Sequence, residues 1–375
     1  MNHRIYLSLA QMGGSELNFI QEAFATNWVV PLGPNVEAFE QSLSDFIGEE
    51  RHVVALSSGT AAIHLGLIQL GVEAGDEVIC QSFTFIATAN PVAYVGAKPV
   101  FIDSEKDTWN MDPVLLEEAI IDRLHKTGKL PKAIIVVHLY GMPAKMKEIV
   151  EIADKYEIPV IEDAAEALGS ALNGRKCGAF GKFGILSFNG NKIITTSGGG
   201  ALVCRTEGQA KKTKYYATQA RDQAPYYQHS HIGYNYRMSN ICAGIGRGQM
   251  LVLEDYIARR KEIHHLYADC LKEIHGITVM QSPDATFDPN FWLTCILIDP
   301  KLTGKSNEEI RMKMESHNIE TRPLWKPMHL QPVFGHATAY VNGTCEHLFN
   351  NGLCLPSGSS LTDNDIQRIT EVIRN

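Results

Sequence analysis

The sequence predicts an α/β protein built on a mainly parallel sheet, with a smaller α/β unit at the C-terminal end. Up to about residue 238, short apolar runs typical of buried strands alternate with helical segments. Beyond that point the pattern changes to one long helical stretch, 240–274, followed by a new set of strands and helices. We therefore expect a large domain over residues 1–250 and a small domain over residues 251–375.

The individual elements follow from apolar spacing and from Gly, Pro and Ser signals. We expect a strand at each of the short apolar runs, which are residues 53–56, 77–80, 100–102, 133–137, 159–161, 184–188 and 291–298. The expected helices share apolar residues at helical spacing: 14–27, 35–48, 57–71 with its cap, 83–95, 307–317 and a last helix after Thr362 and Asp363. Pro91 is unfavourable within the fourth of these helices.

The composition is that of an ordinary globular protein, with 45% hydrophobic and 20% charged residues. The net charge of -8 and the absence of a basic run argue against nucleic-acid binding. No apolar stretch is long enough to cross a membrane, and the N-terminal one is too short for a signal peptide. The 8 cysteines and 14 histidines show no metal-binding spacing, so we expect no metal. We expect a cytoplasmic protein with reduced cysteines.

The stretch 184–200, GILSFNGNKIITTSGGG, places one lysine between apolar segments. It reads as a strand, a turn at 189–191, Lys192, a second strand at 193–196 and a glycine turn. A lysine held among apolar side chains cannot easily reach water, and desolvation lowers its pKa toward the range where the amine is nucleophilic. The alternative interpretation is an ordinary surface lysine on a hairpin.

Three further features could bind the same ligand as this lysine. Small polar residues at 57–60 precede a helix, whose N-terminal N–H groups attract phosphate, although any capped helix looks similar. Asp163 follows a predicted strand and could keep a ring nitrogen protonated, or it could only cap a helix. Phe85 could stack on a flat ring or lie in the core. With Lys192, these features describe a pyridoxal phosphate site in which the lysine forms a Schiff base.

Six segments stand in an order typical of one enzyme family: SSGTAAIH, TFIATAN, GAKPVFID, EDAAEALGS, SFNGNKIITTSGGG and GYNYRMSN. On these motifs the whole chain resembles the DegT/DnrJ/EryC1/StrS sugar aminotransferases. The resemblance implies a pyridoxal phosphate-dependent transferase of fold type I, like aspartate aminotransferase. Six more segments resemble the transaminases of UDP-N-acetylbacillosamine biosynthesis: MGGSEL, WVVPLGP, HLYGMPAKM, ITTSGGG, IETRPLWKPMH and CLPSGSSLT.

The resemblance implies cofactor-binding roles for residues that match family motifs. Lys192 would be the catalytic Schiff-base lysine, and Asp163 would pair with the pyridine nitrogen. Phe85 would stack on the ring. The residues that would hold the phosphate are Gly59, Thr60 and Ser187. Many family members carry glutamine in place of Glu166, which would lie near the 3-oxygen of the cofactor; a carboxylate there is repulsive unless it is protonated or moved aside.

The resemblance also implies a homodimer with shared active sites. Asn235 would reach the phosphate of the cofactor in the neighbouring subunit. Arg237 would line the side of the site that binds the sugar nucleotide, or form an ion pair at the interface. The late stretch Trp325, Lys326 and His329 would line the same side, although Trp325 could serve only in packing.

The expected reaction transfers the amino group of L-glutamate to C4 of a UDP-4-keto-6-deoxy-N-acetylhexosamine and releases 2-oxoglutarate. Lys192 would move the proton, as general base and then as general acid. The alternatives are an aminotransferase for another nucleotide-linked ketosugar, at C3 or C4, and a non-catalytic pyridoxal phosphate-binding regulator. A sugar dehydratase of the same fold is disfavoured, because such enzymes carry histidine at the lysine position.

Overall fold

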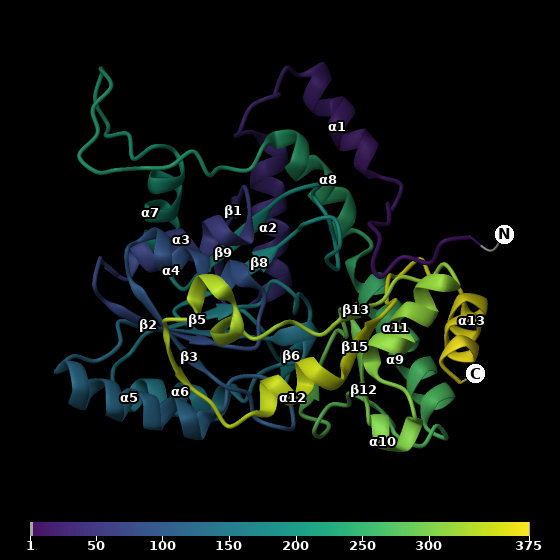
Figure 1. Cartoon of the computed structure of the whole chain (residues 1–375). Coiled ribbons are helices and arrows are strands. Elements are labelled where there is room, and N and C mark those ends of the chain that lie inside the picture. The colour runs from purple at the N-terminus through teal and green to yellow at the C-terminus, as the bar shows by residue number, and fades with distance from the viewer. Residues whose placement is uncertain (1–2, 375) are drawn as a thin grey trace.

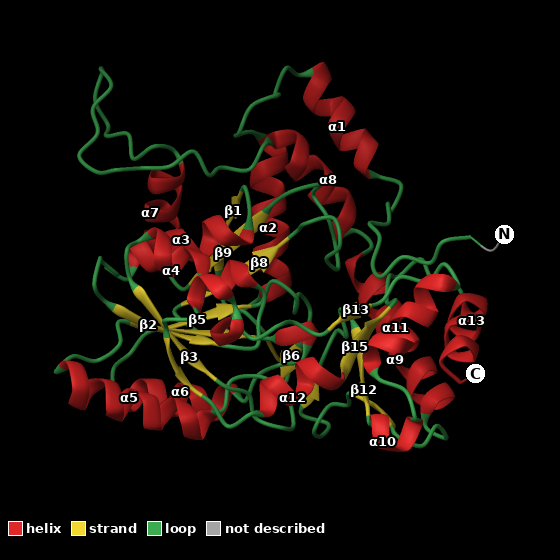
Figure 2. Ribbon diagram, viewed as in Figure 1, coloured by secondary structure: helices red, strands yellow, loops and turns green. Residues whose placement is uncertain are grey.

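The described part of the chain, residues 3–374 of the computed structural model, contains a central eight-stranded sheet between layers of helices (Figures 1 and 2). Its strands, in spatial order, are β1 (His52–Leu56), β9 (Gly200–Cys204), β8 (Phe183–Ser187), β5 (Val160–Asp163), β4 (Ala133–Val137), β2 (Glu77–Gln81), β3 (Lys98–Ile102) and β14 (Thr338–Tyr340). Strand β9 is antiparallel to both neighbours, and the other pairs are parallel. The mainly parallel sheet predicted from the sequence is confirmed.

Helices cover both faces of this sheet, which explains why its strands are apolar throughout. The helices on the two faces are α5 (Pro113–Thr127) and α6 (Met146–Lys155) on one, and α3 (Gly59–Gln69), α4 (Asn90–Tyr94) and α7 (Glu207–Ala217) on the other (Figure 1). Along β4, Ile134 and Val136 pack with α5 and α6, whereas Ala133 and Ile135 join the cluster formed with α3. Successive side chains of a strand point to opposite faces, so a single strand serves both cores.

Two predicted helices near the start of the chain are present as α1 (Glu16–Ala25) and α2 (Pro34–Ile47). The predicted helix 83–95 is only partly formed. A 3₁₀ turn, η1 (Ile86–Thr88), is followed by α4, and Pro91 lies in the first turn of α4. A proline is tolerated there because the first N–H groups of a helix have no partner within the helix.

The prediction of one helix over 240–274 is wrong. The segment forms two helices, α8 (Asn240–Met250) and α9 (Leu253–Leu271), separated by a turn at Leu251 and Val252. Glu254 and Asp255 lie in the first turn of α9, where negative charge stabilises a helix N-terminus. These two acidic residues therefore mark the start of a second helix.

The C-terminal part is a smaller α/β unit with its own core. Its four-stranded antiparallel sheet consists of β10 (Ile277–Val279), β12 (Thr294–Ile298), β15 (Gly352–Leu355) and β13 (Arg322–Pro323). The helices packed with it are α9, α11 (Asn307–Ser316) and α13 (Asp363–Arg374) (Figure 1). Ile5, from the N-terminal segment, belongs to the same core and bridges to Ile319.

The two parts of the chain are interleaved. Strand β14 returns to the edge of the large sheet, and β11 (Phe287–Asp288) pairs with β6 (Ala171–Leu172), which pairs with β7 (Arg175–Lys176). The remaining short elements are α10 (Pro300–Thr303), α12 (Thr344–Asn351), η2 (Leu139–Gly141), η3 (Met328–Leu330) and η4 (Pro332–Phe334). A boundary at residue 250 falls at the turn between α8 and α9, and it remains a prediction.

The predicted strand 193–196 is not formed. Residues 188–199 make an irregular loop between β8 and β9, closed by a hydrogen bond from the Phe188 N–H to the Gly199 carbonyl. Ile193 and Ile194 are buried in the core. The β-branched run that suggested a strand is therefore apolar because the loop packs inward, not because its backbone pairs.

Candidate active site

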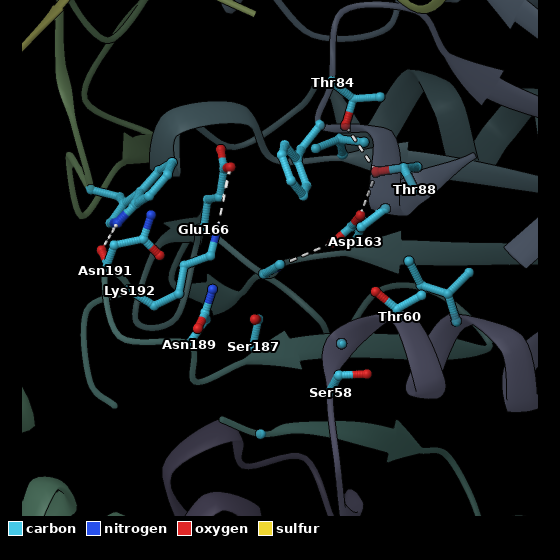
Figure 3. Close-up of a pocket in the computed structure, with 18 of the residues that line it drawn as sticks. Ser58, Thr60, Thr84, Thr88, Asp163, Glu166, Ser187, Asn189, Asn191 and Lys192 are labelled. Carbon is cyan, nitrogen blue, oxygen red and sulfur yellow. Dashed lines mark hydrogen bonds and ion pairs between the residues drawn. The ribbon is translucent and has the colours of Figure 1, made fainter. Parts of the chain in front are cut away.

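A cavity of about 330 Å³ lies where the parallel strands end (Figure 3). Asp163 ends β5, Ser187 ends β8 and Val137 ends β4, and all three line it. Ligands of open α/β sheets commonly bind outside the carboxyl ends of the strands. The cavity brings together eight of the residues predicted for the site: Gly59, Thr60, Phe85, Asp163, Glu166, Ser187, Lys192 and Trp325.

Lys192 extends into this cavity from the loop after β8 (Figure 3). Its Nζ lies 3.4 Å from Glu166 Oε1 and 4.0 Å from the centre of the Trp292 ring. The side chain is 13% exposed, so the lysine is largely removed from water, as predicted, but it faces a carboxylate as well as apolar atoms. The Trp292 indole N–H donates to the Asn191 carbonyl at 2.7 Å, which fixes the ring beside the lysine loop.

Glu166 is buried against the lysine and held by the backbone. Its Oε2 accepts a hydrogen bond of 2.8 Å from the Tyr140 N–H, and Tyr140 has a left-handed backbone with φ of 54°. Burial raises the pKa of the Glu166 carboxyl, and the nearby Lys192 opposes that rise. The carboxylate predicted to be problematic beside a cofactor thus has a cationic partner in this structure.

Asp163 is 6% exposed and accepts hydrogen bonds from neutral groups. The Thr88 hydroxyl donates to Oδ2 at 2.6 Å, and the Ala165 N–H donates to Oδ1 at 3.2 Å (Figure 3). Turns follow β5, and no helix begins there, so the alternative role of Asp163 as a helix cap is wrong. A buried carboxylate with only neutral donors is well placed to pair with a cationic group in the cavity.

The N-terminus of α3 forms the opposite wall and is suited to an anion. Ser58 caps the helix by accepting a hydrogen bond from the Ala61 N–H at 3.0 Å. The earlier N–H groups, of Gly59 and Thr60, have no intrahelical partner and lie at the positive end of the helix dipole. A Cβ added at Gly200 would lie 2.3 Å from the Gly59 nitrogen, so glycine at this position allows β9 to lie against the helix end.

The aromatic wall consists of Phe85, Trp292 and Trp325. Phe85 is 52% exposed, and its ring centre lies 5.7 Å from that of Trp325. The Trp325 N–H donates to the Tyr140 hydroxyl at 2.8 Å, and the Trp325 and Tyr140 rings stack. Tyr140 thus fixes Trp325 at the cavity by a hydrogen bond to its backbone and by ring stacking.

Four predicted residues do not line this cavity: Asn235, Arg237, Lys326 and His329. Asn235 is exposed and bridges to Thr218 at the base of the segment between α7 and α8, which projects away from the sheet (Figure 1). The Arg237 guanidinium, 9% exposed, lies 2.5 Å from Glu40 Oε1 and donates to the Ala55 carbonyl. It therefore forms an internal ion pair and is not presented to the cavity of its own chain.

His329 is likewise engaged elsewhere. Its Nδ1 lies 2.7 Å from the Ser82 hydroxyl, and its Nε2 lies 3.3 Å from Glu346 Oε1. These contacts hold η3 against the end of β2, one residue beyond Gln81. His329 supports the stretch that carries Trp325, and its side chain does not line the cavity around Lys192.

A second cavity, of about 500 Å³, adjoins the first and shares Asn191, Trp292 and Trp325 with it. Lys326, the fourth substrate-side residue predicted, lines this second cavity together with Arg322. Its remaining wall is built from the N-terminal segment and the C-terminal unit: Tyr6, Leu7, Ser8, Leu9, Leu293, Glu320, Pro323, Leu324 and Phe349. Two cationic side chains and several aromatic ones thus line a space beside the lysine site, and one of the cations, Arg322, is paired with Glu320 at 2.8 Å.

The sequence interpretation missed Arg260, which is completely buried behind the lysine loop. Its guanidinium donates to the carbonyls of Trp292 (2.6 Å), Ser357 (3.0 Å) and Lys192 (3.5 Å), and to the Ser8 hydroxyl (3.0 Å). The signal was present in the sequence, because Arg260 shares the buried face of α9 with apolar residues three and four positions away.

The described residues, 3–374, include no group of three or more His, Cys, Asp or Glu side chains that could hold a metal ion. In the same part of the chain, no helix combines the length and apolar character needed to span a bilayer.

Residues 10–374 match the DegT/DnrJ/EryC1/StrS aminotransferase family, and the chain belongs to that family. It is a pyridoxal phosphate-dependent aminotransferase with the fold type I architecture. The cavity fits this cofactor: α3 offers N–H groups to a phosphate, the Asp163 carboxylate accepts only two hydrogen bonds among the described residues and can pair with a ring nitrogen, and the Lys192 amine reaches the same cavity beside Glu166.

Similar proteins cover almost the whole length of the chain. EpsN of Bacillus subtilis (strain 168), named as a pyridoxal phosphate-dependent aminotransferase, is 50% identical, covering 100% of this chain and 96% of EpsN. The GDP-perosamine synthase of Escherichia coli O157:H7 is 36% identical, with 96% of this chain and 95% of that protein covered. The crystal structure of a DegT DnrJ EryC1 StrS aminotransferase from Brucella abortus matches with a TM-score of 0.89, at 31% identity, over 96% of this chain and 94% of the other.

Proposed function

We propose that the protein transfers the amino group of L-glutamate to a nucleotide-linked ketosugar, with UDP-4-keto-6-deoxy-N-acetylhexosamine as its natural acceptor. The observation that carries the proposal is the cavity in which the Lys192 amine, the Asp163 carboxylate and the N-terminus of α3 converge beside a second, cationic cavity. The name of the GDP-perosamine synthase relative supports a nucleotide-sugar acceptor. The choice of UDP and of C4 rests on the sequence motifs alone.

Pyridoxal phosphate supplies an aldehyde that takes up the amino group and a ring that withdraws electrons from the reacting carbon. The α3 N-terminus, with Gly59, Thr60 and Ser187, would hold its phosphate. Asp163 would keep the ring nitrogen protonated, and Phe85 would cover the ring. Lys192 would remove the proton from the substrate carbon of glutamate and return a proton during transfer to the ketosugar.

The second cavity would take the nucleotide diphosphate of the acceptor. Arg322 and Lys326 supply positive charge for phosphate oxygens, and Tyr6 and Phe349 offer aromatic faces for a base. Because Trp292 and Trp325 line both cavities, a sugar diphosphate bound across them would place the sugar near Lys192 and the nucleotide further out.

We further propose that the working form is a homodimer. Exposed apolar side chains gather on segments that project from the sheet, α1, residues 28–32 and the segment between α7 and α8 (Figure 1): Leu17, Phe24, Trp28, Val29, Val30, Leu32, Tyr226, Tyr227 and Ile232. Exposed apolar side chains on several neighbouring segments are typical of an interface, and a second copy could bury them. Asn235 lies at the base of one of these segments, where it could reach a partner's cavity.

The 8 cysteines are free thiols, and the Sγ atoms of Cys295 and Cys354 lie 3.9 Å apart without forming a disulfide. Free thiols in such proximity favour a reducing compartment, and we propose a cytoplasmic location.

A panel of UDP-, dTDP- and GDP-linked 3-keto and 4-keto sugars, each incubated with the enzyme and L-glutamate, tests the substrate. Product amino sugar is measured by mass spectrometry, and 2-oxoglutarate is measured by a coupled assay. The highest kcat/KM is expected for the UDP-linked 4-keto-6-deoxy-N-acetylhexosamine. A higher value for a GDP-linked ketosugar would replace UDP by GDP, and formation of no amino sugar from any of them would contradict an aminotransferase of nucleotide sugars.

A further inference from the structure

We propose that Asn191 is a specificity-determining residue, whose side-chain amide hydrogen-bonds a neutral substituent of the acceptor sugar, either a hydroxyl or an acetamido group. This inference rests on the proposed function and deepens it. It names the residue that recognises the sugar itself, which must lie between the reacting carbon near Lys192 and the nucleotide.

Asn191 lies where the two cavities meet. The residues that line both cavities are Asn191, Trp292 and Trp325, so the described chain has no charged side chain at this junction. An acceptor bound with its reacting carbon near Lys192 and its diphosphate in the second cavity places the sugar ring at the junction. A neutral junction suits a neutral sugar, because a charged substituent would lose water there without gaining an ion pair.

The Asn191 amide is the polar side-chain group at the junction that a ligand can reach. The indole N–H of Trp292 already donates to the Asn191 carbonyl at 2.7 Å, and the indole nitrogen of Trp325 is buried. Asn191, in contrast, is exposed, and its amide has no hydrogen-bond partner among residues 3–374. Figure 3 shows this amide at the edge of the cavity, near the Lys192 side chain. Because an amide both donates and accepts, it can pair with a hydroxyl or with the C=O and N–H of an acetamido group.

The backbone of Asn191 is held in place independently of its side chain. Its carbonyl accepts hydrogen bonds from the Trp292 indole and from the Ser8 hydroxyl, the latter at 2.8 Å. The Ser8 oxygen in turn accepts a hydrogen bond from the buried Arg260 guanidinium at 3.0 Å. A polar group on a fixed backbone costs less entropy to order when a ligand binds, which favours selective recognition. Since these contacts use the carbonyl, a change of the side chain should leave the loop in place.

Asn189, two residues earlier in the same loop, provides a comparison. It lines the first cavity and not the second, and its Oδ1 accepts a hydrogen bond of 2.9 Å from the Gly190 N–H. This contact engages the oxygen within the turn, as is common for asparagine. Asn189 therefore shapes the turn, whereas Asn191 presents its amide to a ligand.

The test measures the binding of unreactive ligands to the enzyme loaded with pyridoxamine phosphate, by isothermal titration calorimetry. The ligands are UDP, UDP-glucose and UDP-N-acetylglucosamine, which have no keto group to be aminated. In Asn191→Ala, loss of one hydrogen bond should raise the Kd of a UDP-sugar by roughly tenfold, while the Kd of UDP stays unchanged. A loss for UDP-N-acetylglucosamine alone assigns the contact to the acetamido group, and an equal loss for both sugars assigns it to a ring hydroxyl.

Asn189→Ala is the matched control from the same loop, and the ratio of the sugar Kd to the UDP Kd should stay at the wild-type value. Circular dichroism and cofactor stoichiometry establish that each variant is folded and loaded. The inference would be overturned by unchanged Kd values for both sugars in Asn191→Ala, or by an equal loss of affinity for UDP itself. It would also be overturned if the wild type bound neither sugar more tightly than UDP.

The binding measurement requires no amino transfer, so its outcome is separate from that of the substrate panel. A sugar-specific loss of affinity, with no amino sugar formed from any ketosugar, would keep Asn191 as a sugar contact and reject the proposed function. Formation of an amino sugar, with unchanged affinities in Asn191→Ala, would do the reverse.

Discussion

The two sides of the active site are built differently. The cofactor side is assembled from the ends of adjacent strands and the capped start of α3, all fixed by the central sheet. The substrate side is assembled from the N-terminal segment, the stretch around Trp325 and the loop of Lys192, with Arg237 turned elsewhere. The first is held by the strand ends of the central sheet, whereas the second depends on loops and on segments from both ends of the chain.

This difference between the two sides indicates that the cofactor side must be rigid and that the substrate side can vary. The position of a reacting carbon must be held within fractions of an ångström, and strand ends in a packed sheet provide that precision. An acceptor of variable sugar and nucleotide can be recognised by loops, which change more readily between relatives. Substitutions on the cofactor side should therefore alter the chemical step, and those on the substrate side should alter acceptor binding.

The largest effect is expected for Lys192→Ala, on the cofactor side. Removing the amine eliminates the proton transfer, and turnover should fall by roughly 10⁴-fold or more. The measurement is amino-sugar formation, combined with borohydride reduction of the wild type and mapping of the modified peptide. Reduced cofactor attached to a lysine other than Lys192 would show that the cofactor side has been assigned incorrectly.

Asp163→Asn should have the next largest effect. The amide keeps the shape and the hydrogen bond to Thr88 but carries no charge to hold a ring proton, so a loss of roughly 100-fold in turnover is expected. Single-turnover reaction of the loaded enzyme with L-glutamate, followed by absorbance, isolates the chemical step. Cofactor retention should change less, because the α3 N-terminus is intact. A near-normal rate would mean that the carboxylate serves only to hold the turn at Ala165.

Asn235→Ala tests whether the cofactor side is completed by a second copy. Loss of one hydrogen bond to a phosphate should weaken cofactor retention by roughly tenfold, with the fold unchanged. Mixed with Lys192→Ala protein, the variant can form heterodimers in which one site carries neither substitution. Recovery of activity after subunit exchange is expected. Activity no higher than that of the Asn235→Ala protein alone at limiting cofactor, despite exchange shown by native mass spectrometry, would restrict each site to one chain.

Lys326→Ala should have the smallest effect and separates the two sides most directly. Loss of one partly solvated contact to phosphate is expected to raise KM for the nucleotide sugar by roughly fivefold. The half-reaction with L-glutamate should be unaffected, because Lys326 lines only the second cavity. Lys301→Ala, an exposed lysine at the start of α10, is the matched control. An equal slowing of both half-reactions would place Lys326 on the cofactor side.

The sequence was sufficient to predict those parts of the fold and of the site that depend on short-range patterns. The parallel sheet, the capped helix after residue 57, Asp163 at a strand end and the glycine turn before Gly200 all follow from short-range signals. The motif resemblance then selected Lys192 from the many lysines of the chain. These features coincide with the cofactor side.

The rest depends on contacts that no local pattern contains. Ile193 and Ile194 have strand propensity, but burial of their side chains in a loop overrides it. Arg237 matched a motif, yet Glu40, almost 200 positions away, binds its guanidinium. Trp292 was read as part of a strand, and only the fold places its ring against the Lys192 amine. The conformation of the lysine loop and the positions of the Arg237 and Trp292 side chains therefore depend on long-range packing, which the local sequence does not show.

The buried guanidinium of Arg260 has a consequence for how the enzyme opens. It joins the start of the small sheet, the N-terminal segment and the lysine loop through neutral acceptors, with no carboxylate among its contacts in the described chain. A motion that pulled α9 away from the lysine loop would break the hydrogen bonds of this buried cation to the carbonyls of Trp292 and Lys192. Hinged separation of the two units is thus penalised at the point nearest the chemistry. We therefore expect the framework behind Lys192 to stay assembled while substrates bind on the opposite side of the cavity.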